Sequence, residues 1–318
     1  MGEFDLIDRY FKHPARRNAL GVGDDCALLS PGAGMQLAVS CDMLVEGRHF
    51  LPTVDPFKLG HKALAVNLSD LAACGAKPLA FTLALAMPFV DEAWLEPFSR
   101  GLFALADEYG CELVGGDTTR GPLNICITVF GEVPQGQALL RSGAQAGDDV
   151  YVSGTLGDAR LALEVFRGTL SVPAEVFNAA RARLEQPTPR VALGQALRGI
   201  ASSAIDVSDG LLGDLGHILK QSAVGARIGT EIAAGLIGAA AGSLPVDQRI
   251  QYVLAGGDDY ELLFTAPPAR REAVAAAALA AGTPVTRIGQ VEAKPGLRLV
   301  DGAGQRVDRR YASFDHFA

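Results

Sequence analysis

Two aspartates, Asp206 and Asp209, stand three residues apart in the segment AIDVSDGLLGDLGHIL, residues 204–219. A strand-like run gives way to a helical pattern here, and the segment contains no lysine or arginine that could neutralise the two acids. Asp209 is placed to cap the helix, because a side-chain oxygen at this position accepts a backbone hydrogen bond from the first turn. A helix cap explains one acid and leaves Asp206 without a local role.

Aspartates in similar surroundings recur along the chain, beside glycine or small residues and mostly at the ends of apolar runs. They are Asp24, Asp25, Asp42, Asp70, Asp117, Asp258 and Asp259. Each could be an ordinary turn or cap residue. Asp70 fits that alternative worst, since Leu68 and Leu71 indicate a half-buried helix in which an unpaired carboxylate is costly. Strand ends in α/β folds are the usual location of ligand sites, so we expect the acids to converge.

Converging carboxylates need cations, because two like charges about 4 Å apart cost roughly 4 kcal/mol at an effective dielectric constant of about 20. Mg²⁺ prefers ligand sets made only of oxygen and usually works through substrate phosphates. The pattern therefore indicates a Mg²⁺-dependent enzyme of nucleotide phosphates. Arg120 and Arg141 are candidates for phosphate contact. The P-loop, Rossmann and protein-kinase signatures do not occur in the sequence.

Helical and strand patterns alternate along the chain and would position these residues. Helices are predicted over residues 2–11, 55–76, 91–110, 158–166, 211–222 and 271–282. Strands are predicted over residues 35–44, 78–87, 111–116, 123–133, 150–154, 201–206, 260–266 and 286–291, the first ending near Asp42. The strand over 260–266 carries Glu261, whose carboxylate would either face a cleft or be an ordinary exposed strand residue. Both halves of the chain mix helices with strands, so the predicted fold class is α/β or α+β.

A Gly-, Gln- and Ser-rich segment over residues 134–149 predicts a junction between two domains, residues 1–137 and 138–318. The formal net charge of −8 argues against nucleic acid as a partner. The longest apolar runs, residues 78–90 and 232–245, are shorter than the roughly 20 residues of a membrane span, and the acidic start is unlike a signal peptide. Five cysteines without a C-x-x-C pair favour neither zinc nor disulfides, which fits a cytoplasmic location.

Several motifs taken together are similar to those of one known family, the thiamine-monophosphate kinases. They are GVGDDCALL (21–29), VEGRHF (45–50), HKALAVNLSDLAACGA (61–76), CELVGGDTTRGPL (111–123), IDVSDGLLGDLGHIL (205–219), GGDDYELLFT (256–265) and FDHF (314–317). The wider superfamily includes aminoimidazole ribonucleotide synthetase and selenophosphate synthetase. The resemblance implies a synthetase-superfamily fold, with an N-terminal domain whose sheet pairs with a second subunit in a homodimer, and a C-terminal α/β domain. The active site is expected between the domains.

The same resemblance implies phosphorylation of thiamine monophosphate to thiamine diphosphate, with ATP as co-substrate and several Mg²⁺ ions as cofactors. The implied metal ligands are Asp25, Ser40, Cys41, Asp42, Asp70, Asp117, Asp206 and Asp209. The implied ATP contacts are Tyr109, Gly116, Asp117, Arg141 and Ser208, and the implied substrate contacts are His49, Glu261 and Phe314. Asp209 and Arg141 would act in catalysis. Cys41 stands where relatives often carry Thr or Ser, a change that a backbone carbonyl ligand survives and a hydroxyl ligand does not.

In the implied reaction, a phosphate oxygen of thiamine monophosphate is the nucleophile. The second pKa of a phosphate monoester is about 6, so this oxygen is anionic at neutral pH and needs no strong general base. Mg²⁺ and Arg141 would screen the repulsion between the two phosphates and align them for in-line transfer. Two alternatives stay open: a related ATP-dependent synthetase, such as aminoimidazole ribonucleotide synthetase, and a Mg²⁺-nucleotide sensor without turnover. Only the kinase would form thiamine diphosphate.

Overall fold

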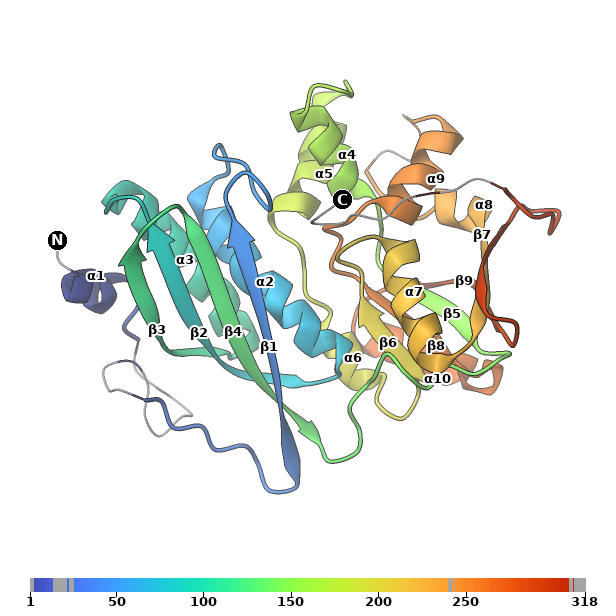
Figure 1. The fold of residues 1–318 in the computed structure, drawn as a ribbon, viewed down its shortest axis with the longest axis horizontal. Coiled ribbons are helices and arrows are strands. Elements are labelled where there is room, and N and C mark those ends of the chain that lie inside the picture. The colour runs from blue at the N-terminus through green and yellow to red at the C-terminus, as the bar shows by residue number, and fades with distance from the viewer. Residues whose placement is uncertain are drawn as a thin grey trace. The chain divides into compact units, whose positions relative to one another are not determined.

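The computed structural model describes residues 3–13, 22, 26–239, 242, 244–308 and 311, with the backbone alone for residues 3 and 4. Two predicted site residues, Asp25 and Phe314, lie outside the described residues. The chain divides into two compact units, and each is described by itself (Figure 1). Unit 1 comprises Met1–Leu71 and Ala76–Gly136, and unit 2 comprises Ala72–Gly75 and Gln137–Ala318.

Unit 1 is built on a four-stranded sheet with the strand order β1-β4-β2-β3. Its strands are β1 (Met35–Val45), β2 (Lys77–Met87), β3 (Glu112–Arg120) and β4 (Asn124–Pro134). The pairs β1–β4 and β2–β4 are antiparallel, whereas β2 and β3 are parallel. Helices α2 (Pro56–Ala73) and α3 (Glu92–Tyr109) lie on one face of the sheet, and α1 (Glu3–Tyr10) contacts α3 (Figure 1). No helix in the described part of unit 1 covers the other face.

Helices α2 and α3 approach each other closely because each carries a glycine at the contact. A Cβ atom on Gly60 would lie 2.1 Å from the carbonyl oxygen of Phe98, and one on Gly101 would lie 1.8 Å from that of Phe57. Neither position has room for a side chain, since such contacts are far inside van der Waals distance. The contact holds α2 in place, and α2 carries Asp70, one of the predicted ligands.

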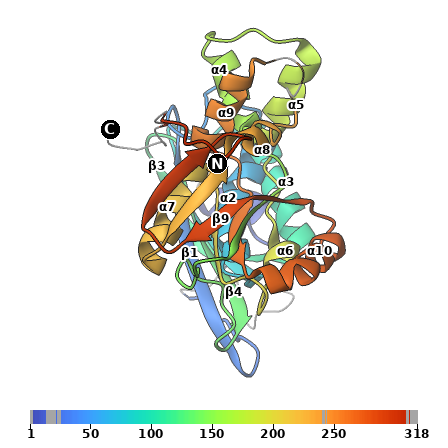
Figure 2. The same ribbon diagram turned by 90° about the vertical axis from the view of Figure 1, so that its right-hand side faces the viewer.

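Unit 2 contains a six-stranded sheet with the strand order β10-β7-β9-β5-β8-β6. Its strands are β5 (Asp149–Ser153), β6 (Ser203–Asp206), β7 (Gly225–Gly229), β8 (Leu262–Ala266), β9 (Val285–Glu292) and β10 (Gly296–Val300). Its α-helices are α4 (Asp158–Phe166), α5 (Ala174–Glu185), α6 (Val191–Ala196), α7 (Leu211–Ser222), α8 (Thr230–Ala234), α9 (Val246–Ala255) and α10 (Arg271–Ala280). A short 3₁₀-helix, η1 (Pro268–Arg270), precedes α10. Helix α10 lies beside α6 (Figure 2).

Side chains of unit 2 alternate between the two faces of its sheet, as strand geometry requires. Val150 and Val152 of β5 join the large hydrophobic core that helices α4, α5, α7, α8 and α9 complete. Tyr151, between them, points to the opposite face, where α10 lies and where its ring stacks on Phe264 with centroids 5.2 Å apart. Helix α10 also contacts α6. The middle of the sheet is therefore buried on both faces.

Most of the predicted elements are present, but several predicted strand bounds are wrong, and two of them change where site residues lie. The strand that was expected to end near Asp42 continues to Val45, and the strand that was expected to end at Gly116 continues to Arg120, because β4 and β2 supply pairing partners over the added length. Asp42 and Asp117 therefore lie inside strands and not at strand ends. Helices α5, α6, α8 and α9 and strands β7 and β10 have no counterpart among the predictions. Within the described ranges, no helix has both the length and the hydropathy needed to cross a membrane.

Candidate functional site

In unit 2, the chain passes from β6 into α7 through the turn that carries Asp206 and Asp209. Asp206 is the last residue of β6 and is buried, whereas Ser208 and Asp209 are half-buried. Gly210 follows with φ 115°, a conformation that suits glycine and strains other residues. The N–H of Asp258 donates to the carbonyl oxygen of Ser208 at 2.8 Å and holds the turn from the neighbouring loop. Three predicted site residues thus share one fixed turn.

The prediction that Asp209 caps α7 is wrong. The N-cap position is Gly210, which offers no side chain. Asp214, in the first turn, reaches back so that its Oδ2 accepts from the N–H groups of Asp209 at 3.2 Å and Gly210 at 3.1 Å. Burial, together with the charge of Asp209, raises the pKa of Asp214 to about 7. The capping role belongs to Asp214, which leaves the Asp209 carboxylate without one.

The loop that precedes β8 lies against this turn in a strained conformation. Asp258 and Tyr260 have φ values of 64° and 52°, the left-handed region that residues with a Cβ rarely adopt. The N–H of Tyr260 donates to the carbonyl oxygen of Val207 at 2.9 Å. Both carboxylate oxygens of Asp259 lie 3.0 Å from the backbone N of Gly157, and burial raises the pKa of Asp259 well above its ordinary value. Asp259 therefore fastens this loop to the turn before α4.

Glu261 lies just before β8 and is fully buried, so the prediction that it lies on a strand and faces a cleft is wrong. Its Oε1 accepts from Nη2 of Arg183 at 2.6 Å and from Nη2 of Arg190 at 2.5 Å. Its Oε2 accepts from Nε of Arg190 at 2.6 Å and from the hydroxyl of Ser153 at 2.5 Å. Two oxygens with about four acceptor positions thus receive four hydrogen bonds. The predicted role of Glu261 in substrate binding stays a prediction.

In unit 1, β1 and α2 bring two of the predicted ligands together. The hydroxyl of Ser40 donates to Oδ2 of Asp70 at 2.5 Å. Two residues further along β1, the backbone N–H of Asp42 donates to the side-chain oxygen of Asn67 at 3.0 Å. Because alternate residues of a strand share a face, the side chains of Ser40 and Asp42 both point toward α2. Ser40 and Asp70, 30 residues apart in the sequence, therefore place neighbouring oxygen atoms that could bind a cation.

Cys41 lies between these two residues and points to the opposite face of the sheet. It is exposed, and its Sγ lies 3.4 Å from Sγ of Cys126 on β4. Burial and the hydrogen bond with Cys41 raise the pKa of Cys126 to about 11, so this thiol stays protonated at neutral pH. Thiol sulfur is a soft donor and a poor ligand for a hard cation such as Mg²⁺. Any metal contact from position 41 would therefore have to come from the backbone carbonyl.

Gly116 and Asp117 lie on β3, at the other edge of the same sheet. β4 and β2 separate β3 from β1, a span of three strand spacings, or about 14 Å. A Cβ atom on Gly116 would lie 1.9 Å from the carbonyl oxygen of Leu83, so glycine is required there. The pairing register places Asp117 level with Met43, on the face without helices, where both are exposed. Within unit 1, Asp117 is not brought to Ser40 and Asp70.

The remaining predicted residues of the described chain are placed as follows. His49 is half-buried in the turn after β1, and its Nδ1 accepts from the N–H of Val45 at 3.0 Å, so the ring proton of a neutral His49 lies on Nε2. Tyr109 is the last residue of α3 and is half-buried. Arg141 is exposed in unit 2, in the segment between β4 and β5. No three His, Cys, Asp or Glu residues among those described form a ready metal site.

Comparison with known proteins identifies the family. The family model of the AIR synthase related protein N-terminal domain matches residues 23–133, and that of the C-terminal domain matches residues 145–302. Thiamine-monophosphate kinase of Salmonella typhimurium is 50% identical over 100% of this chain and 98% of its own length. This chain belongs to the thiamine-monophosphate kinase family. The predicted family resemblance and the predicted two-domain α/β fold class are thereby confirmed.

Two solved structures of this family share the fold. The crystal structure of thiamine-monophosphate kinase from Stenotrophomonas maltophilia K279a is 44% identical, with a TM-score of 0.85 over 96% of each chain. AaThiL complexed with AMPPCP and TMP is 30% identical, with a TM-score of 0.77 over 91% of this chain and 89% of that chain. The similarity extends over both units.

Sequence reasoning missed the residues that hold the family's motifs in place. Arg183 and Arg190, which bind Glu261, lie in or next to helices that were not predicted. Asp214 was not expected to accept backbone hydrogen bonds, and Asp259 was counted among the ligand candidates. The one signal in the sequence was the composition of GGDDYE (256–261), in which three acids closely follow two glycines. Partners for such acids can only be assigned once the fold is known.

Proposed function

We propose that this chain transfers the γ-phosphate of ATP to thiamine monophosphate, giving ADP and thiamine diphosphate. Membership of the thiamine-monophosphate kinase family over the full chain is the observation that carries the proposal. The AaThiL relative is described as bound to AMPPCP and TMP, an ATP analogue and a phosphorylated substrate, which fits the same reaction. We propose further that residues 1–137 bind ATP and Mg²⁺ and form the dimer, and that residues 138–318 complete the active site.

The side-chain atoms available to bind a metal suit Mg²⁺. Ser40 and Asp70 in unit 1 and Asp206 and Asp209 in unit 2 supply only oxygen, the donor that this cation prefers. The proposed ligands are Asp25, Ser40, the backbone carbonyl of Cys41, Asp42, Asp70, Asp117, Asp206 and Asp209. When bound, Mg²⁺ would neutralise phosphate charge.

The chain's own residues would bind and orient the two phosphates. Arg141, exposed and always charged, is the proposed group that screens their repulsion, because a guanidinium can donate two parallel hydrogen bonds to a phosphate. Asp209 is the proposed catalytic carboxylate. The proposed ATP contacts are Tyr109, Gly116, Asp117, Arg141 and Ser208. No general base is required, since the attacking phosphate oxygen is ionised at neutral pH.

The proposed contacts to thiamine monophosphate are His49, Glu261 and Phe314. His49 would donate from Nε2, the nitrogen that carries its proton when Nδ1 accepts from Val45. Phe314 would present its ring to the cationic thiazolium. A direct bond from Glu261 would have to replace one of the four that it accepts in this structure, from Arg183, Arg190 and Ser153.

We also propose a homodimer formed through the sheet of unit 1. The face of β1 that α2 does not cover exposes Met35, Leu37, Val39 and Met43. A row of large apolar side chains along an edge strand is typical of a surface that pairs with another chain. A cytoplasmic location stays a prediction from the sequence.

The proposed reaction is tested by incubating the protein with ATP, Mg²⁺ and thiamine monophosphate and measuring thiamine diphosphate by chromatography. Asp209→Asn should lower kcat by about 10²-fold or more, since it removes a charged ligand from the phosphate site. The melting temperature should not fall, because the charge of Asp209 repels the buried carboxylate of Asp214. Asp247→Asn, on an exposed position of α9, is the matched control and should leave kcat unchanged. Absence of thiamine diphosphate in the wild-type reaction would refute the proposed function, and normal turnover of Asp209→Asn would refute the role of Asp209.

A further inference from the structure

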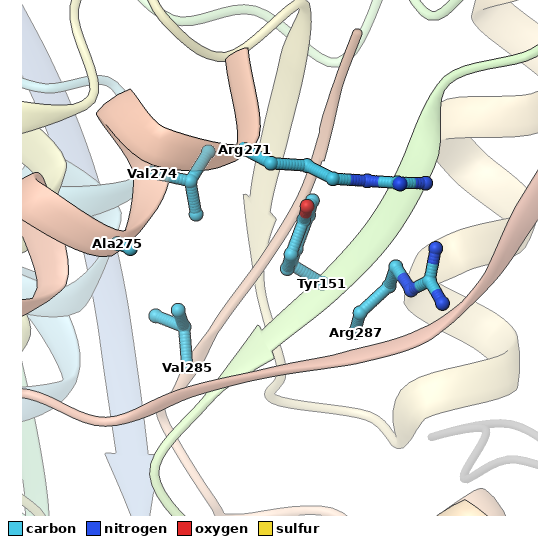
Figure 3. A pocket seen from close by; sticks show the side chains of 6 residues that line it. All are labelled: Tyr151, Arg271, Val274, Ala275, Val285 and Arg287. Carbon is cyan, nitrogen blue, oxygen red and sulfur yellow. The ribbon is translucent and has the colours of Figure 1, made fainter. Parts of the chain in front are cut away.

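A pocket that the proposed function does not use lies beside α10 in unit 2. It has a volume of about 380 Å³ and is lined by Tyr151, Arg271, Val274, Ala275, Val285 and Arg287 (Figure 3). This volume lies in the range of small-molecule sites, roughly 300–1,000 Å³. The pocket is on the sheet face that α10 covers, whereas α7, which follows the turn with Asp206 and Asp209, packs into the core on the other face.

The two walls of the pocket differ in chemistry. Val274, Ala275 and Val285 form an apolar wall, and Figure 3 shows the guanidinium groups of Arg271 and Arg287 on the other side, next to the hydroxyl of Tyr151. One wall can therefore take hydrocarbon and the other can take negative charge.

A buried carboxylate fixes both arginines. Asp149 is 1% exposed, and its oxygens accept from Nε of Arg271 at 2.6 Å and from Nη2 at 3.0 Å. Its Oδ1 also accepts from Nη1 of Arg287 at 3.2 Å, and its Oδ2 accepts from the hydroxyl of Tyr151 at 3.3 Å. The hydrogen bonds from Arg271 keep the pKa of Asp149 below its ordinary value, so the carboxylate is ionised at neutral pH.

This arrangement leaves an excess of positive charge and of donors. Two guanidinium cations share one carboxylate, and they are 51% and 53% exposed at Arg271 and Arg287. Each guanidinium has five N–H donors, of which Asp149 takes two from Arg271 and one from Arg287. Because Asp149 already holds them in position, a ligand would lose less free energy to side-chain ordering than it would on mobile surface arginines.

A purely structural role would account for less of this geometry. An ion pair that fastens α10 to β5 needs only Arg271, whose two bonds already neutralise Asp149. Arg287 on β9 adds a second charge that Asp149 does not require, and it lies across from an apolar wall and beside an open volume.

We propose that this pocket binds a small organic anion. Its carboxylate or phosphate group would accept hydrogen bonds from Arg271 and Arg287, and its compact apolar body would lie on Val274, Ala275 and Val285. This site is independent of the proposed kinase reaction.

Ligand-observed ¹⁹F NMR tests the proposal on the full chain, with 4-fluorobenzoate, 4-fluorophenyl phosphate and 4-fluorobenzamide as probes. The benzoate or the phosphate ester should bind saturably, and comparison of the two shows which anionic group the pocket prefers. The uncharged amide should bind about tenfold more weakly or worse, since it loses a hydrogen bond between two charged groups. Equal binding of the amide and both anions would overturn the proposal, as would the absence of saturable binding by either anion.

Two variants with matched controls locate the binding. Arg287→Gln keeps the paired bonds between Arg271 and Asp149, and it should weaken the anion about tenfold, whereas Arg227→Gln on β7 should not. Ala275→Phe fills the pocket from an exposed position of α10, so that it blocks binding without a charge change, whereas Ala276→Phe, exposed outside the lining, should not. Anion binding that survives Ala275→Phe belongs to another site and contradicts the proposal, even if Arg287→Gln fails to fold.

Discussion

Replacing Glu261 by Gln should destabilise unit 2 severely. The carboxylate is 0% exposed and is the shared counter-charge of Arg183 and Arg190, which are themselves mostly buried. A glutamine of the same shape keeps one acceptor oxygen but turns an NH₂ group toward donors from Arg190 and Ser153. Breaking a buried ion pair by removing one partner costs about 3–5 kcal/mol, because the remaining charge is left uncompensated. For a folding unit of about 150–250 residues, this loss lowers the melting temperature by about 6–20 °C.

Thermal unfolding followed by circular dichroism measures the effect, with Glu292→Gln as the matched control. Glu292 pairs with Arg298 at 2.7 Å, but both side chains are part-exposed, so the pair contributes about 1 kcal/mol or less. The control should therefore lower the melting temperature by about 4 °C at most. Equal, small shifts in the two variants would refute the reasoning, since they would mean that the buried network contributes no more than a surface pair.

The same variant separates two roles of Glu261. Steady-state kinetics well below the melting temperature give the KM for thiamine monophosphate and the kcat of the folded fraction. A KM that rises several-fold while the KM for ATP is unchanged supports the proposed substrate contact, because a lost ground-state contact raises KM selectively. Unchanged KM values with a lowered melting temperature would assign Glu261 to the fold alone.

Two further predictions concern stability. Because burial raises the pKa of Asp214 from 3.8 to about 7, its contribution to stability is fully present below pH 3.8 and is lost as the pH rises through 7. Urea unfolding in EDTA gives the free energy of unfolding at each pH. Between pH 4 and 8, this free energy should fall by up to about 4 kcal/mol more in wild type than in Asp214→Asn. The same pH dependence in both proteins would contradict the prediction. Gly101→Ala should destabilise by about 1–3 kcal/mol or more, because its Cβ would meet a backbone carbonyl. Gly216→Ala, in a helix with open space around it, should instead stabilise by up to about 1 kcal/mol, and thermal shifts of the same sign would refute this contrast.

Hydrophobic periodicity was enough to predict most of the fold, because it reports which face of an element is buried. The helix that carries Asp70 and the strand that carries Ser40 are both in place. Strand ends were less predictable, since β1 and β3 extend as far as β4 and β2 offer pairing partners, and no local signal marks that length. The positions of Asp42 and Asp117 within their strands follow from these neighbours.

The oxygen-rich chemistry of the candidate site was also readable from residue types, but its spatial grouping was not. Ser40 and Asp70 meet because β1 packs on α2, a tertiary contact. Asp117 carries the same kind of side chain in a similar motif and lies three strands away on the other face. Which aspartates adjoin each other depends on strand order and register, which a single sequence does not specify.

Near the turn between β6 and α7, Asp214 and Asp259 bind backbone N–H groups, whereas Asp209 does not cap the helix. Asp214 accepts from the backbone of Asp209, and Asp259 accepts from Gly157, so both hold the chain in shape. Each of these carboxylates accepts a hydrogen bond from a buried N–H group that would otherwise be unsatisfied. The burial that this requires raises the pKa of the carboxylate. Asp209 makes no cap, and the turn that presents it is fixed by others. Below the raised pKa of Asp214 or Asp259, loss of either acid should therefore lower the melting temperature, whereas loss of Asp209 should lower turnover without lowering the melting temperature.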